Sequence, residues 1–197
     1  MGCSSLMTIE IRNLHYSYKS SEVLKGITFA ASEGSLLCVL GKNGAGKSTL
    51  FRCILGLLKG YGGKILIDGR EAAELSAREL AGKISYIPQN HSSVYSFSVL
   101  DMVTMGATNR LKSFESPGRT HRAAAMEALG MVNIGHLSDR NFCSISGGEQ
   151  QLVLIARAIA QRTKIIIMDE PCSNLDYGNQ IKVMKTVKDL TRQGYLI

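Results

Sequence analysis

The sequence is short of several features that would assign the chain to a specialised class of protein. It has no tryptophan, only 3 prolines among 197 residues, and fewer acidic side chains (16) than basic ones (23). The scarcity of proline and a hydrophobic fraction of 45% exclude an intrinsically disordered or collagen-like chain. No run approaches the ~18 uncharged apolar residues of a membrane-spanning helix. What remains is the composition of one globular domain with a sizeable core.

The cysteines, histidines and charges also lack informative clustering. The 5 cysteines are odd in number and never spaced as C-x-x-C, which predicts reduced thiols in a cytoplasmic protein. The 4 histidines are isolated, so no zinc site is expected. The net charge of +7 is spread along the chain without a basic run, so nucleic acid is not an expected partner. Residues 1–6 lack the pattern of a signal peptide and are predicted to be a short N-terminal extension.

Hydrophobic spacing predicts strands that alternate with helices. Strands are expected at residues 8–13, 35–40, 65–67, 84–87 and 164–169, and helices at 47–59 and 178–192. The continuous apolar run 35–40 is typical of a strand buried on both faces. Helical spacing dominates residues 98–145, which we interpret as an inserted helical subdomain. The sequence therefore predicts an α/β fold with a mainly parallel sheet and antiparallel N-terminal strands, over residues 7–197.

A glycine-rich motif of the form G-x-x-x-x-G-K-[ST] follows the run 35–40 and opens the first predicted helix. In this pattern the glycines let backbone N–H groups approach phosphate oxygens, and the helix N-terminus adds positive potential. Lys47 is expected to reach the β- and γ-phosphates, and the Ser48 hydroxyl to ligate Mg²⁺. The motif predicts a P-loop NTPase, with the expected nucleotide-binding residues Gly41, Lys42, Asn43, Gly44, Ala45, Gly46, Lys47, Ser48 and Thr49.

Two acidic residues end the apolar strand predicted at 164–169. Asp169 is expected to hold Mg²⁺ through water, and Glu170 to polarise the attacking water. Two acids at a strand end are more often only a solvated corner. Together with a complete phosphate loop upstream, they instead favour the catalytic interpretation.

A third motif, S-G-G-E, precedes an apolar helical face. S-x-x-E alone is an ordinary capping box, but twin glycines cost a helix about 1 kcal/mol each and suit a backbone that approaches phosphate. The order of phosphate loop, Gln89, S-G-G-E and the pair Asp169 and Glu170 closely resembles the nucleotide-binding domain of ABC-type ATPases. That resemblance covers essentially the whole chain.

The resemblance implies roles for matching positions and a second copy of the chain. Tyr18 corresponds to the aromatic residue that stacks on adenine, and Gln89 to the glutamine that contacts Mg²⁺ and the attacking water. Asp176 lies in the segment that crosses the dimer interface. In the family, two such domains sandwich two ATP molecules head to tail, and the S-G-G-E motif completes the opposite ATP site: Ser146, Gly147, Gly148 and Glu149.

Finer segments at 99–106, 151–158 and 175–180 resemble the importers of ferric siderophores, haem and cobalamin. The resemblance implies ATP and Mg²⁺ as cofactors, an integral membrane permease and a substrate-binding protein as partners, and a cytoplasmic location on the inner face of the membrane. Cargo and permease are not encoded here. Two alternatives stay open: an ATP-binding form without turnover, and a non-transport ABC protein that acts on nucleic acid or ribosomes.

The sequence also departs from the family pattern. Ile145 stands where leucine is usual and Cys172 where a small hydroxyl residue is usual, and both changes are expected to be mild. The family carries a histidine after the strand that residues 195–197 begin, and none of this chain's 4 histidines matches it. We therefore expect nucleotide binding to be better supported than turnover, and one sheet edge to be unpaired.

Overall fold

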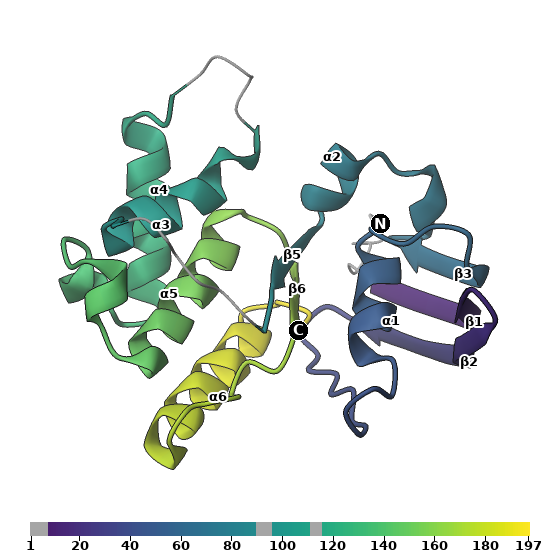
Figure 1. Ribbon diagram of the computed structural model, residues 1–197. Coiled ribbons are helices and arrows are strands. Elements are labelled where there is room, and N and C mark those ends of the chain that lie inside the picture. The colour runs from purple at the N-terminus through teal and green to yellow at the C-terminus, as the bar shows by residue number, and fades with distance from the viewer. Residues whose placement is uncertain (1–7, 90–95, 111–115) are drawn as a thin grey trace.

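The computed structural model describes residues 8–89, 96–110 and 116–197, so the expected extension at 1–6 lies outside it. Two lobes flank a short central pair of strands (Figure 1). One lobe combines an antiparallel sheet with helix α1, and the other is built from helices α3, α4 and α5. The α/β class predicted from the sequence is confirmed.

The antiparallel sheet has the strand order β2-β1-β3-β4. The apolar side chains of β1 alternate with polar ones, and Ile9, Ile11 and Leu14 are buried. They pack with Leu50 and Ile54 of α1 in one hydrophobic cluster. The strands and helices of this lobe are β1 (Thr8–Tyr18), β2 (Ser21–Ser32), β3 (Gly62–Ile67), β4 (Arg70–Glu71), α1 (Lys47–Ile54), η1 (Ala72–Glu74) and α2 (Ala77–Ala81).

The central strands β5 (Ile84–Ile87) and β6 (Ile165–Met168) pair in parallel, with Ile84 opposite Ile165 and Ile87 opposite Met168. An isolated parallel bridge joins Ile165 to Leu196 on the other edge of β6. A mainly parallel sheet was expected. In the described residues the larger, four-stranded sheet is antiparallel, and regular parallel pairing is limited to β5 and β6.

The strand predicted at residues 35–40 is absent from the described structure, and this part of the prediction is wrong. Leu40 is 91% exposed, and Leu36 and Leu37 are also exposed. The segment makes two backbone hydrogen bonds to Ile197, from the Leu37 N–H at 2.8 Å and to the Ser35 carbonyl at 3.0 Å. An apolar run becomes a buried strand only where neighbouring strands pair with both of its edges. Here Ile197 alone makes such backbone hydrogen bonds to the segment within the described ranges.

The second lobe is helical and has its own hydrophobic cluster. Val99, Leu129 and Val153 are fully buried where α3, α4 and α5 meet. Val183 and Val187 attach α6 to the same cluster. The helices are α3 (Val99–Gly106), η2 (Ala107–Arg110), α4 (Arg119–Met131), η3 (Gly135–Leu137), η4 (Phe142–Ser144), α5 (Gly147–Ala160) and α6 (Tyr177–Arg192).

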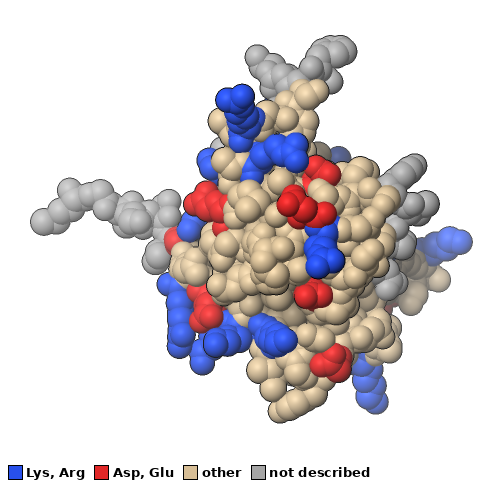
Figure 2. Space-filling view, turned by 90° about the vertical axis from the view of Figure 1, so that its left-hand side faces the viewer, with Lys and Arg blue, Asp and Glu red and all other residues tan. Residues whose placement is uncertain are grey.

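Charged side chains are interspersed on the face of the helical lobe. Figure 2 shows lysines and arginines alternating with acidic residues around a largely uncharged centre. The excess positive charge is thus not gathered into one patch on this face. Within the described ranges, no helix has the length and apolar character needed to cross a membrane.

Candidate nucleotide site

The glycine-rich loop turns directly into α1. Gly46 caps the helix with a φ of +96°, a left-handed conformation that favours glycine. A Cβ at Gly46 would lie 2.9 Å from Val23 Cγ1 on β2, so the loop and the β1–β2 hairpin are in close contact. Glycine is therefore required here by both conformation and packing, and the helix N-terminus is left facing the loop.

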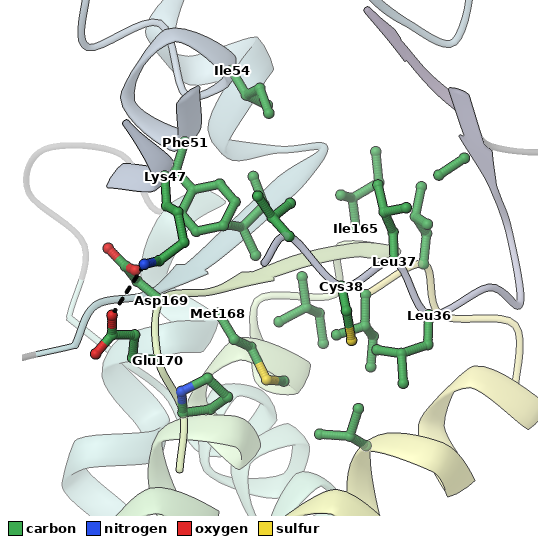
Figure 3. A pocket seen from close by; sticks show the side chains of 18 of the residues that line it. Leu36, Leu37, Cys38, Lys47, Phe51, Ile54, Ile165, Met168, Asp169 and Glu170 are labelled. Carbon is green, nitrogen blue, oxygen red and sulfur yellow. Dashed lines mark ion pairs between the residues drawn. The ribbon is translucent and has the colours of Figure 1, made fainter. Parts of the chain in front are cut away.

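Lys47, the first residue of α1, folds back across the loop. Its ammonium group donates a hydrogen bond to the Gly41 carbonyl at 2.8 Å and another to the Lys42 carbonyl at 3.3 Å. Its Nζ also lies 3.7 Å from Glu170 Oε1, as the dashed line in Figure 3 marks. The loop and the end of β6, far apart in the sequence, thus meet through one lysine.

Asp169 follows β6 and is buried, with only 6% of its surface exposed. Its Oδ2 accepts a hydrogen bond from Ser48 Oγ at 2.9 Å and a longer one from the Tyr86 hydroxyl at 3.4 Å. Burial, and then the negative charge of Asp169, raise the pKa of Tyr86. Tyr86 was not predicted from the sequence, although its place on β5, the strand paired with the one that precedes Asp169, is a signal for it.

Glu170 is held from two sides. Oε1 faces Lys47, and Oε2 accepts a hydrogen bond from Gln89 Nε2 at 2.7 Å. Its backbone has a φ of +50°, which is uncommon for a residue other than glycine. Such strain persists only where surrounding contacts enforce it, and it is common at functional sites.

The oxygen donors at this point fit Mg²⁺. The Ser48 hydroxyl and the buried Asp169 carboxylate are hard ligands in mutual contact. Mg²⁺ is usually bound by one or two protein groups together with phosphate oxygens and water, rather than by a complete protein cage. The described residues contain no cluster of three or more His, Cys, Asp or Glu side chains that would form such a cage.

The S-G-G-E motif caps α5 in the other lobe. Ser146 accepts from the Glu149 N–H, and the Glu149 carboxylate accepts from the Ser146 N–H at 2.8 Å, which completes a capping box. Hydrogen bonding to the side chain and then the backbone of Ser146 lowers the pKa of Glu149. Among the residues that the structure describes, no hydrogen bond or ion pair joins this motif to the phosphate loop, and Figure 1 places the start of α5 in the lobe opposite α1.

The second glycine of the motif has a packing role that sequence analysis missed. A Cβ at Gly148 would lie 2.4 Å from Asn179 Cγ, whereas one at Gly147 would meet only Leu175 Cδ2 at 3.6 Å. Asn179 also donates from its backbone N–H to Asp176 Oδ1 at 2.9 Å, and Asp176 is the N-cap of α6. The backbone bond from Asn179 is the main cause that lowers the pKa of Asp176.

Tyr18 lies at the end of β1, in the hairpin that packs on the phosphate loop. Its ring is edge-on to Tyr16, with centroids 5.0 Å apart and an interplanar angle of 81°. The residue is 41% exposed. An exposed aromatic face in this hairpin is available for stacking on a flat ring system.

Comparison with known proteins agrees with this geometry. The sequence profile described as "ABC transporter" matches residues 24–173. An uncharacterised ABC transporter ATP-binding protein of Haemophilus influenzae is 44% identical over 191 residues, with 97% of this chain and 73% of the relative covered. A probable iron chelatin transport ATP-binding protein of Helicobacter pylori is 36% identical, with 93% of this chain and 72% of the relative covered.

A molybdate import ATP-binding protein of Haemophilus influenzae is 39% identical, with 93% of this chain and 68% of the relative covered. Among solved structures, an inward-facing ABC transporter described as of metal-chelate type is similar with a TM-score of 0.85 and 37% identity. That alignment covers 97% of this chain and 71% of the solved one. The chain belongs to the ABC transporter ATP-binding protein family.

Proposed function

We propose that this chain binds and hydrolyses ATP with Mg²⁺ as one half of a head-to-tail homodimer, and that it powers import through a separate membrane permease. The observation that carries the proposal is the convergence of Lys47, Glu170 and Gln89 beside the Ser48–Asp169 pair. A cation, a carboxylate, an amide and hard oxygen ligands meet at one helix N-terminus. These are the groups that phosphoryl transfer to water requires.

The residues have separable tasks in this mechanism. Lys47 turns its ammonium group from the loop carbonyls to the terminal phosphates and neutralises their charge. Glu170 accepts a proton from the attacking water, and Gln89, already bonded to Glu170, orients that water. Ser48 and Asp169 would hold Mg²⁺, which when bound would neutralise negative charge on the phosphates. Tyr18 supplies a face for the adenine ring.

A second copy explains why the S-G-G-E motif lies apart from the phosphate loop. The N-terminus of α5 lies in the helical lobe, where Ser146 and Gly147 are exposed. Such an N-terminus attracts phosphate. In a head-to-tail dimer, Ser146, Gly147 and Gly148 of one subunit would close the ATP site of the other. Asp176, at the start of α6 beside Gly148, would then lie at the interface.

The cargo class we propose is an iron complex, haem or cobalamin. Support comes from relatives described as iron chelatin transport and cobalamin import ATP-binding proteins. The relative described as a molybdate import ATP-binding protein makes molybdate an alternative cargo. A permease and a substrate-binding protein would be the partners, and the chain would sit at the inner face of the membrane through the permease. A cavity of about 290 Å³ lies beside α3 and α5, and the partly buried Arg157 is one of its lining residues. We propose this cavity as a contact surface for the permease.

The substitution Glu170→Gln tests this proposal. It keeps shape and hydrogen bonding but removes the proton acceptor, so we expect ATP binding to be retained and turnover to fall by roughly 100-fold or more. ATP should then hold the variant as a dimer of twice 21.4 kDa in size-exclusion chromatography with light scattering. Glu74→Gln, an exposed change outside the site, is the matched control.

Three outcomes decide the proposal. Loss of turnover with an ATP-dependent dimer supports it. Unchanged turnover in Glu170→Gln would contradict the role of Glu170. ATP binding without turnover in the unchanged chain, even with a permease added, would favour the ATP-binding form that does not hydrolyse.

A further inference from the structure

The start of α5 lies against the start of α6. In the S-G-G-E motif that opens α5, Ser146 and Gly147 are exposed and Gly148 is buried. A Cβ added at Gly148 would lie 2.4 Å from Cγ and 2.5 Å from Oδ1 of Asn179, a residue in the first turn of α6. The side chain of Asn179 thus fills the space that any larger residue at position 148 would need.

The same asparagine is bonded twice to Asp176, the N-cap of α6. Its Nδ2 donates to Asp176 Oδ2 at 2.6 Å, and its backbone N–H donates to Asp176 Oδ1 at 2.9 Å. The backbone bond is the ordinary N-cap bond, which almost any residue at 179 would make. The side-chain bond needs a donor at this position, and it holds the amide of Asn179 against Gly148.

Gln180, the next residue, holds a different segment. Its Nε2 donates to the Leu175 carbonyl at 2.9 Å and to the Cys172 carbonyl at 3.4 Å. Both carbonyls belong to the loop that connects Glu170 with α6. This loop is thus held by bonds that do not involve Asn179. A change in the side chain of Asn179 is therefore expected to leave Glu170 in place.

We propose that Asn179 is a positioning residue, whose side chain fixes the spacing between the S-G-G-E motif and Asp176. The inference rests on the proposed head-to-tail dimer, in which the motif closes the ATP site of the other subunit and Asp176 lies at the interface. Asn179 contacts neither the nucleotide nor the other subunit in this arrangement. It acts through Gly148 and Asp176, so that both reach the second subunit in one fixed geometry.

The chemistry of the pair allows a reciprocal exchange. Asn179→Asp keeps the size of the side chain but removes the donor, and it places a second carboxylate beside Asp176. Adding Asp176→Asn restores a donor facing an acceptor, and asparagine is also a good N-cap. The exchanged chain therefore keeps the hydrogen bond with its direction reversed.

The test uses the Glu170→Gln chain as parent and measures the ATP concentration for half-maximal dimerisation by light scattering. Adding Asn179→Asp should raise this concentration by roughly fivefold or more, because the S-G-G-E motif is no longer held beside Asp176. Exchanging residues 176 and 179 should restore it to within about twofold of the parent. Asn133→Asp makes the same chemical change at an exposed site of the helical lobe, and it should dimerise as the parent does.

A second readout separates positioning from a loss of folding. Binding of a fluorescent ATP analogue, at a protein concentration too low for dimers, should be equal in all variants, because the phosphate loop lies in the other lobe. If Asn179→Asp does not fold, the exchanged chain decides: dimerisation like that of the parent supports the pair, and a weaker dimer overturns it.

The remaining outcomes distinguish this inference from the function on which it rests. Equal dimerisation of the parent and the Asn179→Asp variant would overturn the positioning role alone, and so would a defect that the exchange does not correct. A parent that binds the ATP analogue but forms no dimer would overturn the proposed homodimer, and this inference with it.

Discussion

The two edges of β6 face very different surroundings. On one edge β5 pairs with every residue of the strand, and Ile87 and Ile166 are 1% exposed. On the other edge, within the described ranges, only Leu196 forms a bridge, and an apolar cleft separates β6 from residues 35–40. The strand's sequence is apolar throughout, so hydrophobicity alone does not decide which edge is closed. An edge is closed where a neighbouring strand offers matching backbone hydrogen-bonding groups.

The difference between the two edges also shapes the site at the end of β6. Asp169 and Glu170 are fixed from the closed side, where the Asp169 N–H donates to the Ile87 carbonyl at 2.9 Å and Gln89 reaches Glu170. The phosphate loop approaches from the other side and meets them through Ser48 and Lys47. The proposed catalytic groups thus rest on a well-packed edge and face a less packed one.

The largest predicted effect contrasts the two edges directly. Ile87→Ala should destabilise the chain by about 3 kcal/mol, because it leaves a cavity beside β6 in the closed core. The Leu40 side chain is 91% exposed, so Leu40→Ala loses little packing inside the protein. It should change the free energy of unfolding by less than about 0.5 kcal/mol. Urea denaturation of both variants measures the difference. Equal costs would show that the cleft is closed in solution.

A second prediction tests the closed packing where α5 meets α6. Gly148→Ala should cost about 2 kcal/mol, because the new methyl group would press on Asn179. Gly147→Ala is the matched control, and its methyl group would make only an ordinary contact with Leu175, so a change within about 0.5 kcal/mol is expected. Thermal unfolding of the pair provides the measurement. A tolerated alanine at 148 would indicate a looser contact than described here.

The smallest predicted effect concerns Tyr86, which links β5 to the site. Tyr86→Phe removes a long hydrogen bond to Asp169 and keeps the ring. We expect the Mg²⁺ concentration for half-maximal ATP binding to rise by about two- to fivefold, equivalent to about 0.5–1 kcal/mol. Tyr61→Phe in the same lobe controls for loss of a phenol hydroxyl. A larger effect on the control than on Tyr86→Phe would rule out the positioning role.

Local signals in the sequence predicted much of the fold. The strand at 84–87 is found as predicted, and α6 begins within one residue of its expected start. Helical periodicity and capping depend on neighbours in sequence, so they are readable there. The first helix is shorter than expected, since Gly56 follows it with a φ of +68°.

Features that depend on distant partners could not be read in the same way. Residues 35–40 have the composition of a buried strand, yet pairing along both edges is decided by segments far away in the chain. The bond from Gln89 to Glu170 spans 81 positions, and that from Ser48 to Asp169 spans 121. The motifs predicted which residue types would meet. Which atoms of Glu170 face Lys47 and Gln89 emerged only from the structure.

Equilibrium binding of ATP, with and without Mg²⁺, tests the central claim most directly. We expect Mg²⁺-dependent binding to the unchanged chain and a loss of affinity of roughly 10- to 100-fold in Lys47→Ala, because a charge-assisted bond to phosphate is removed. Lys59→Ala, an exposed change past the end of α1, should bind as the unchanged chain does. Equal affinity of Lys47→Ala and Lys59→Ala for ATP would contradict the account.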